Sequence, residues 1–347
     1  MWCIFRKALI MFKIDIHTHI IPHNLNELIS TFNDSRFLSM HFIDDHNAML
    51  KKDGDDFRKV SCNCWHPSER IEDCLKTGVD VQVLSTIPVL FSYWAENDQA
   101  LELSHFLNDH IHQITKETQK TFLGLGTIPM QNVDFAIQEM DRCIKELNFP
   151  GIQIGSNING DNLNEEKFDP IFKHAEQIDC SIFVHPWEML GTSEMKKYWL
   201  PWLVGMPAET SRAMCSLIFG GVLEKYPNLK FAFAHGGGSF PFTMGRIDHG
   251  YNMRPDLCAI DNSILPSYYL GKFYVDSLVH DENTLKFIID RMGSEKIALG
   301  SDYPFPLGEK NPGQIIQNLN VSEKIKQRML AGTALEWLGL NEQDYIN

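Results

Sequence analysis

Five residues that can bind a metal ion or carry a proton stand at the ends of short apolar segments. They are His17, His19, His185, His235 and Asp302. Residues two apart in a β-strand face the same side, so the imidazoles of His17 and His19 can hold one ion. Three imidazoles and a carboxylate suit Zn²⁺ and leave a coordination position for water. The residues therefore predict a zinc centre, and spacing alone leaves open which histidine would serve as acid or base.

Eight apolar segments, separated by longer stretches with helical spacing, must position these residues. The segments are 13–19, 79–86, 122–128, 151–155, 181–185, 230–235, 273–278 and 296–302. Such alternation predicts an α/β fold with a parallel sheet, and eight units can close a (β/α)8 barrel whose active groups lie at the carboxyl ends of the strands. An open doubly wound sheet is the alternative. It would usually carry a glycine-rich phosphate loop after the first strand, where this chain has His-Thr-His.

Residues 20 to about 65 do not follow this rhythm, because they are polar and rich in His, Asp and Lys. We expect them to form an extended, irregular first loop at the catalytic face, as a small insertion. No long linker interrupts the remaining sequence. We therefore predict a single barrel domain over 13–347, preceded by an N-terminal extension of residues 1–12.

The composition narrows the class of partner. The chain has 31 Lys and Arg against 45 Asp and Glu, a net charge of −14, which argues against nucleic acid and anionic membrane surfaces. It does not exclude an anionic substrate, because a metal ion and arginines can make a pocket locally positive. The eight cysteines are scattered without zinc-ribbon spacing, and no apolar run approaches the length of about 18 residues needed to span a membrane. We expect reduced thiols and a cytosolic, that is cytoplasmic, location.

Longer stretches carry a family resemblance. They include KIDIHTHI, LSTIPVLFSYWA, FVHPWEM, KYWLPWLVGMPAET, FAHGGGSFPFTMGRI and LGSDYPFPLGE. From Lys13 to about Leu340 the chain resembles the amidohydrolase superfamily of metal-dependent (β/α)8 barrels, and in particular a decarboxylase among its members. The resemblance implies a carboxy-lyase that removes CO₂ without oxidation from a small polycarboxylate.

The resemblance also implies roles for the five residues. His17, His19, His185 and Asp302 would hold one zinc ion per subunit, and His235 would be the base and later the proton donor. Dinuclear members of the superfamily carry a bridging lysine at the end of the fourth strand. The corresponding segment 151–155 reads Gly-Ile-Gln-Ile-Gly, which favours one metal ion.

Substrate contacts come from the same resemblance. Arg58 would bind a substrate carboxylate, and Arg246 would cross the interface of a homodimer into the neighbouring subunit's site. Both roles suit the planar, two-pronged guanidinium group. Further pocket residues implied in this way are Lys52, Met189, Trp202 and Phe305.

Three other functions are compatible with such a metal centre. The first is hydrolysis of an amide, a lactone or a deaminable ring, and the second is decarboxylation of an aromatic acid. The third is a non-catalytic scaffold, which would usually have lost a ligand or His235. The pair of arginines favours a polycarboxylate substrate and therefore the decarboxylase.

Overall fold

The computed structural model describes residues 11–118 and 120–345 of the chain. Most of the predicted N-terminal extension, residues 1–10, lies outside this range. The division into an extension and a single domain therefore stays a prediction.

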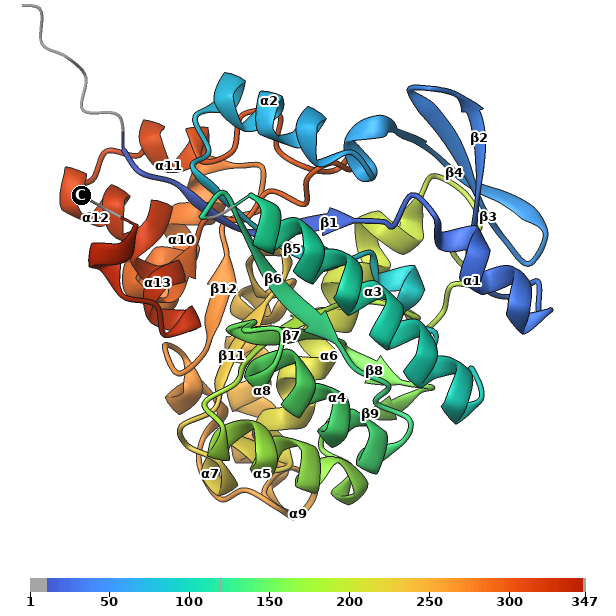
Figure 1. The fold of residues 1–347 in the computed structure, drawn as a ribbon. Coiled ribbons are helices and arrows are strands. Elements are labelled where there is room, and N and C mark those ends of the chain that lie inside the picture. The colour runs from blue at the N-terminus through green and yellow to red at the C-terminus, as the bar shows by residue number, and fades with distance from the viewer. Residues whose placement is uncertain (1–10, 119, 346–347) are drawn as a thin grey trace, which may run out of the picture.

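A parallel sheet of eight strands forms the centre of the molecule (Figure 1). In spatial order its strands are β1 (Ile14–Ile20), β5 (Val81–Thr86), β6 (Phe122–Thr127), β7 (Gly151–Gly155), β10 (Ser181–His185), β11 (Lys230–Phe233), β12 (Tyr274–Asp276) and β13 (Ile297–Ala298). Each of the eight predicted segments coincides with one of them, and only β1 extends past its segment, by one residue. The first strand meets the segment after the last, because the amide of Ile16 donates to the carbonyl of Leu299 at 2.9 Å and Thr18 bridges Tyr303 in parallel. The predicted (β/α)8 barrel is confirmed.

Helices surround the sheet and pack against it through apolar side chains. They are α2 (Pro67–Thr77), α3 (Asn97–Glu117), α4 (Val133–Lys145), α5 (Asp169–Gln177), α6 (Met206–Phe219), α7 (Val222–Lys225), α8 (Phe240–Met253), α9 (Pro255–Cys258), α10 (Glu282–Met292), α11 (Gln314–Asn318), α12 (Glu323–Gln327) and α13 (Thr333–Leu338). Three of them begin at side chains that cap free backbone amides: Asn132 accepts from Phe135 in α4, Asp281 from Thr284 in α10, and Ser322 from Ile325 in α12. Ile152 and Val184 of the strands belong to the large apolar cluster that the helices complete.

The insertion between β1 and β5 is more regular than the sequence predicts. It contains α1 (Leu25–Phe32) and an antiparallel sheet of β2 (Ser39–Asp44), β3 (Asn47–Lys52) and β4 (Asp55–Ser61), which projects from the barrel beside α1 (Figure 1). The predicted small insertion is present, but it is folded rather than irregular. One face of this sheet buries Leu50 and Val60 against Trp65, while the other carries charges, so its residues look polar on average. A second short hairpin, β8 (Asn157–Ile158) and β9 (Asp161–Asn162), follows β7.

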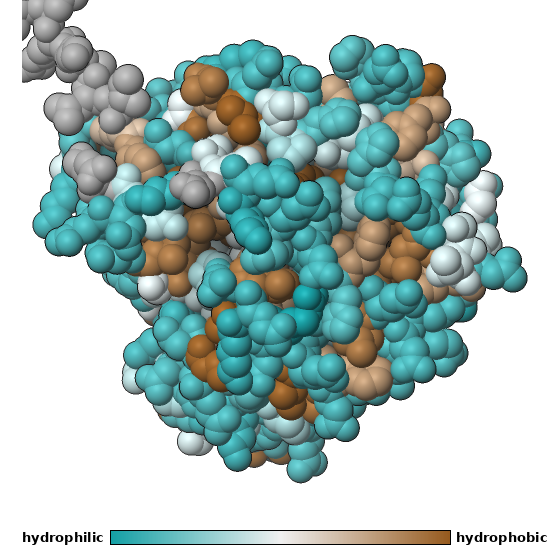
Figure 2. Space-filling model, in the orientation of Figure 1, coloured by the Kyte–Doolittle hydropathy of each residue, from teal (hydrophilic) through white to brown (hydrophobic). Residues whose placement is uncertain are grey.

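The outer surface is predominantly hydrophilic on the face shown in Figure 2, where apolar side chains are interrupted by polar ones. Over the described residues, none of the helices combines the length and the apolar character that crossing a membrane requires. The seven cysteines in that part of the chain, Cys62, Cys64, Cys74, Cys143, Cys180, Cys215 and Cys258, are free thiols.

Candidate metal centre and substrate cavity

The barrel brings the five predicted residues to one end of the sheet. His17 and His19 lie on β1, His185 is the last residue of β10, and His235 and Asp302 follow β11 and β13. Carboxyl ends of parallel strands converge in a barrel, so residues far apart in sequence meet there. The first three histidines are at most 3% exposed, and Asp302 is 9% exposed.

Four of these side chains offer ligand atoms to a common point. The Nε2 atoms of His17 and His19 are 3.2 Å apart, and Oδ1 of Asp302 lies 3.5 Å from the first and 3.2 Å from the second. With His185 included, one ligand atom from each of the four residues lies within 4.8 Å of every other. The predicted ligand set is therefore brought together.

The Nδ1 atoms of the three imidazoles have partners of their own, and these partners show which nitrogen of each ring carries the hydrogen. Nδ1 of His19 lies 3.0 Å from the carbonyl of Thr86, and Nδ1 of His185 lies 2.9 Å from the carbonyl of Pro186. A carbonyl oxygen only accepts, so both Nδ1 atoms carry the hydrogen and both Nε2 atoms present lone pairs. Nδ1 of His17 is held in the same way by Asp276 at 2.6 Å.

Lone pairs that face one another and a carboxylate repel unless a cation lies between them. Nε2 of His185 is buried with no hydrogen-bond partner among the described residues. Burial, and then the neighbouring His17 and His19, lower the pKa of His185 well below its ordinary value, so it stays a neutral ligand. Burial alone would raise the pKa of Asp302, but its close contact with His19 and the adjacent imidazoles hold it at about 2, so the group is a carboxylate. Three imidazole nitrogens, each oriented by a second contact of its ring, and a carboxylate fit a divalent transition metal ion.

His235 lies beside this set. The centroid of its ring is 5.2 Å from those of His17 and His185. Its Nδ1 is buried and has no hydrogen-bond partner in the described chain. Burial and the nearby His17 lower the pKa of His235 to about 4, which keeps the imidazole neutral and able to accept a proton.

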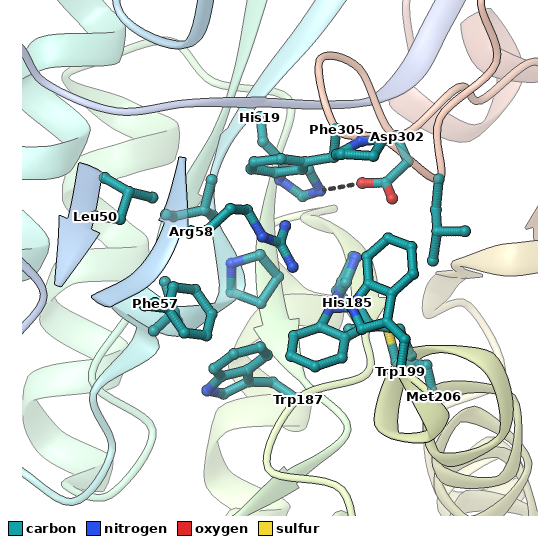
Figure 3. Close-up of a pocket in the computed structure, with 16 residues that line it drawn as sticks. His19, Leu50, Phe57, Arg58, His185, Trp187, Trp199, Met206, Asp302 and Phe305 are labelled. Atoms are coloured by element: carbon teal, nitrogen blue, oxygen red, sulfur yellow. Dashed lines mark ion pairs between the residues drawn. The ribbon is translucent and has the colours of Figure 1, made fainter. Parts of the chain in front are cut away.

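A cavity opens over the ligands (Figure 3). Arg58 of β4 reaches into it from the insertion, and the structure gives its guanidinium no ion pair or hydrogen bond with any described residue. The centre of this group lies 4.9 Å from the ring of Phe305 and 5.4 Å from each of the rings of Phe57 and Trp202. Burial lowers the pKa of Arg58, although Asp302 partly opposes the shift. A cation that is removed from water and left unpaired is a receptor for an anion.

The other predicted substrate contacts divide into two groups. Trp202 and Phe305 line the cavity. Lys52 and Met189 do not: the ammonium of Lys52 lies 3.6 Å from the carboxylate of Glu188, and Met189 is buried behind the wall. Arg246 is exposed on α8 and does not belong to the cavity of its own subunit.

Sequence reasoning missed several residues of the site. Asp276 ends β12, at the same end of the barrel as the ligands, and that position was a signal that could have found it. Phe57, Trp187 and Trp199 line the cavity from the insertion and from the segment after β10. Only the folded arrangement of those two segments shows that these aromatic side chains face one another.

Comparison with known proteins places this arrangement in a family. The model of the family described as Amidohydrolase matches residues 14–340. The chain is 54% identical to a 2-amino-3-carboxymuconate-6-semialdehyde decarboxylase of Dictyostelium discoideum, over 96% of this chain and 93% of the relative. It is 34% identical to the decarboxylase of the same name from Caenorhabditis elegans, over 96% of both chains.

A solved structure shows the same fold. A 5-carboxyvanillate decarboxylase from Novosphingobium aromaticivorans, complexed with manganese and a nitrobenzoic acid, superposes with a TM-score of 0.80 at 22% identity, covering 95% of this chain and 96% of that one. The resemblance stated from the sequence is confirmed. The chain belongs to the amidohydrolase family and, within it, is similar over nearly its whole length to the 2-amino-3-carboxymuconate-6-semialdehyde decarboxylases.

Proposed function

We propose that this protein is a zinc-dependent carboxy-lyase that converts 2-amino-3-carboxymuconate 6-semialdehyde to 2-aminomuconate 6-semialdehyde and CO₂. The observation that carries the proposal is the half-buried Arg58, which has no ion pair among the described residues and lies above four converging ligand atoms, in a chain 54% identical to a relative named for this reaction. The reaction would belong to tryptophan catabolism through kynurenine. There it would limit the spontaneous cyclisation of the substrate to quinolinate.

One zinc ion per subunit would be held by His17, His19, His185 and Asp302. Three nitrogen donors and one oxygen donor suit Zn²⁺, and a single carboxylate leaves the bound ion with net positive charge. When bound, the ion supplies the Lewis acidity that lowers the pKa of water and stabilises negative charge on substrate oxygen.

Arg58 would bind a substrate carboxylate through two parallel hydrogen bonds and so fix the orientation of the scissile group. The aromatic rings of Phe57, Trp202 and Phe305 surround the guanidinium, so they restrict its motion and exclude water from the ion pair. The same apolar walls suit the conjugated chain of the substrate.

His235 would move the proton. As a neutral, buried imidazole it would accept a proton from water and later deliver it to the carbon that loses the carboxyl group. The hydroxide left behind would take up a proton from solvent, so that each turnover consumes one proton. In the overall reaction the carbon–carbon bond to the carboxylate breaks, its electron pair stays on the substrate carbon, and that carbon takes the proton as CO₂ leaves.

A homodimer would complete the pocket. Arg246 is exposed on α8, and the same helix also exposes the apolar side chains of Phe242, by 52%, and Met253, by 63%. We infer that this face packs against a second copy of the chain, so that each subunit gives its Arg246 to the other's cavity as a second carboxylate contact.

The experiment that tests the function follows the near-ultraviolet absorbance of the substrate together with CO₂ release, with zinc-loaded and with chelator-treated protein. The proposal expects metal-dependent loss of absorbance with one CO₂ per substrate. The alternative is another mononuclear decarboxylase or hydrolase for an aromatic or unsaturated carboxylate. Turnover of an aromatic acid such as 5-carboxyvanillate, without turnover of the muconate semialdehyde, would establish that alternative.

A further inference from the structure

We propose that Asp276 is a positioning residue that orients a metal ligand, His17, and the acid–base residue, His235, through one buried carboxylate. The inference rests on the roles proposed above for these two histidines. Asp276 is fully buried at the carboxyl end of β12, a strand that carries none of the predicted ligands. It contacts neither the cavity nor the common point of the ligand atoms.

The carboxylate of Asp276 receives four hydrogen bonds. Its Oδ2 accepts from Nδ1 of His17 at 2.6 Å and from the amide of His235 at 2.9 Å. Its Oδ1 accepts from the amide of Gly236 at 2.8 Å and from that of Leu278 at 3.1 Å. A carboxylate has about four lone-pair positions, so this set satisfies all of them and leaves no place for a proton.

The contact with His17 selects one tautomer. With the hydrogen on Nδ1 directed at Asp276, Nε2 of His17 must present its lone pair to His19 and Asp302. The other tautomer would direct an N–H at the metal position and could not bind an ion there. Asp276 thus does for His17 what backbone carbonyls do for His19 and His185, but with a charged acceptor that also raises the basicity of the ligand.

The contacts with His235 and Gly236 hold an unusual backbone turn. His235 has φ of 58° and Gly236 has φ of 61°, and a non-glycine residue is strained in this left-handed region. Successive amides in such a turn point in one direction and form a concave anion site. The carboxylate of Asp276 fills that site, so it fixes the segment that carries the imidazole of His235.

Gly300 shows how closely this arrangement is packed. A Cβ atom at residue 300 would lie 2.6 Å from Cβ of Asp276 and 2.9 Å from Cβ of His17. Only glycine leaves room for the two side chains to meet beneath the ligands. A larger residue at this position would push Asp276 and His17 apart while leaving the charge of both unchanged.

The test replaces Asp276 by asparagine in the full chain. An amide has one oxygen and one NH₂ group, so it must direct hydrogens either at Nδ1 of His17 or at the amides of His235 and Gly236. The matched control is Glu139→Gln, since Glu139 is also a fully buried carboxylate but pairs with Asn108 and Arg142 between α3 and α4. Zn²⁺ affinity is measured by competition with a chromogenic chelator, and the tautomer of His17 by long-range ¹H–¹⁵N correlation spectra of metal-free, ¹⁵N-histidine-labelled protein.

We expect Asp276→Asn to weaken Zn²⁺ binding by about 10- to 100-fold and to move the His17 hydrogen to Nε2, whereas Glu139→Gln changes neither. Should Asp276→Asn not fold, Gly300→Ala serves as the second variant, and it should weaken Zn²⁺ binding in the same direction. Wild-type affinity together with an Nδ1-protonated His17 in whichever variant folds would overturn the proposal. Both measurements are made without substrate, so a wrong assignment of the decarboxylase reaction would leave them unaffected.

Discussion

Replacing Arg58 by methionine should reduce catalysis and, at the same time, stabilise the free protein. Arg58 is a half-buried cation without an ion pair in the described chain, and its partial burial lowers its pKa. Three aromatic rings lie 4.9 to 5.4 Å from the guanidinium. The free protein therefore bears the cost of desolvating this charge, and the bound substrate compensates for it.

The size of the catalytic effect follows from the two hydrogen bonds that a carboxylate would accept from Arg58. Each charge-assisted hydrogen bond contributes about 1.5–3 kcal/mol, so the pair contributes about 3–6 kcal/mol. Since about 1.4 kcal/mol corresponds to a factor of ten, kcat/KM should fall by about 10²- to 10⁴-fold. Arg58→Lys keeps the charge but loses the fork, so its loss should be smaller than that of Arg58→Met.

The assay combines decarboxylation kinetics with urea unfolding of the substrate-free, zinc-loaded protein. The control is Arg142→Met, because Arg142 forms two hydrogen bonds with the buried carboxylate of Glu139. Removing that paired cation leaves a buried charge and should destabilise the fold by about 3–5 kcal/mol, whereas Arg58→Met should raise the free energy of unfolding. If Arg58→Met destabilised the protein as much as the control, or kept wild-type kcat/KM, the carboxylate-receptor argument would be refuted.

Four further predictions concern the metal centre, the dimer and pH. His235→Ala should keep its zinc, as measured by metal analysis, but lose about 10²- to 10⁴-fold in kcat, and a wild-type kcat would contradict its acid–base role. Asp302→Ala should lose zinc, and full occupancy by the same analysis would argue against its being a ligand. Mixing inactive Arg58→Met and Arg246→Ala proteins should restore activity, because a mixed dimer contains one intact site; no recovery despite subunit exchange would contradict the shared site. Burial lowers the pKa of His110 from its ordinary value of 6.5 to about 4. Between these two pH values the imidazole is protonated in the unfolded chain but neutral in the folded one. Stability should therefore fall as the pH falls through this window, by at most about 3 kcal/mol, and His110→Gln should lose this part of the pH dependence in urea unfolding at pH 7 and pH 5.

The barrel and the ligand set could be predicted because each depends on a short-range pattern. Apolar segments alternating with helical spacing predict parallel strands, and a parallel barrel places every strand end on one face. His185 and Asp302, 117 residues apart in the numbering, could thus be assigned to one site before any contact was known. The roles of His235, Arg58 and Arg246 came from family resemblance, since spacing does not distinguish a ligand from an acid or a base.

The insertion and the substrate cavity could not be predicted to the same extent. The sheet of the insertion buries only one face, so the charged residues on its other face hide the apolar strand pattern in the sequence. Lys52 stays a predicted substrate contact: its ammonium lies 3.6 Å from the carboxylate of Glu188 and 5.7 Å from the ring of Trp187, which lines the cavity. The aromatic rings around Arg58 come from separate segments, and no local sequence pattern predicts that these segments pack together.

The sequence by itself determined that metal-binding and proton-carrying residues would gather at the carboxyl ends of eight parallel strands, because strand periodicity and barrel topology are set locally. Tertiary structure alone decided that Asp276 orients His17 and His235 together and that Arg58 lies unpaired among aromatic rings. The physical reason is that hydrogen-bond direction, burial and the absence of a charge partner are properties of a packed neighbourhood. They arise only when distant segments meet.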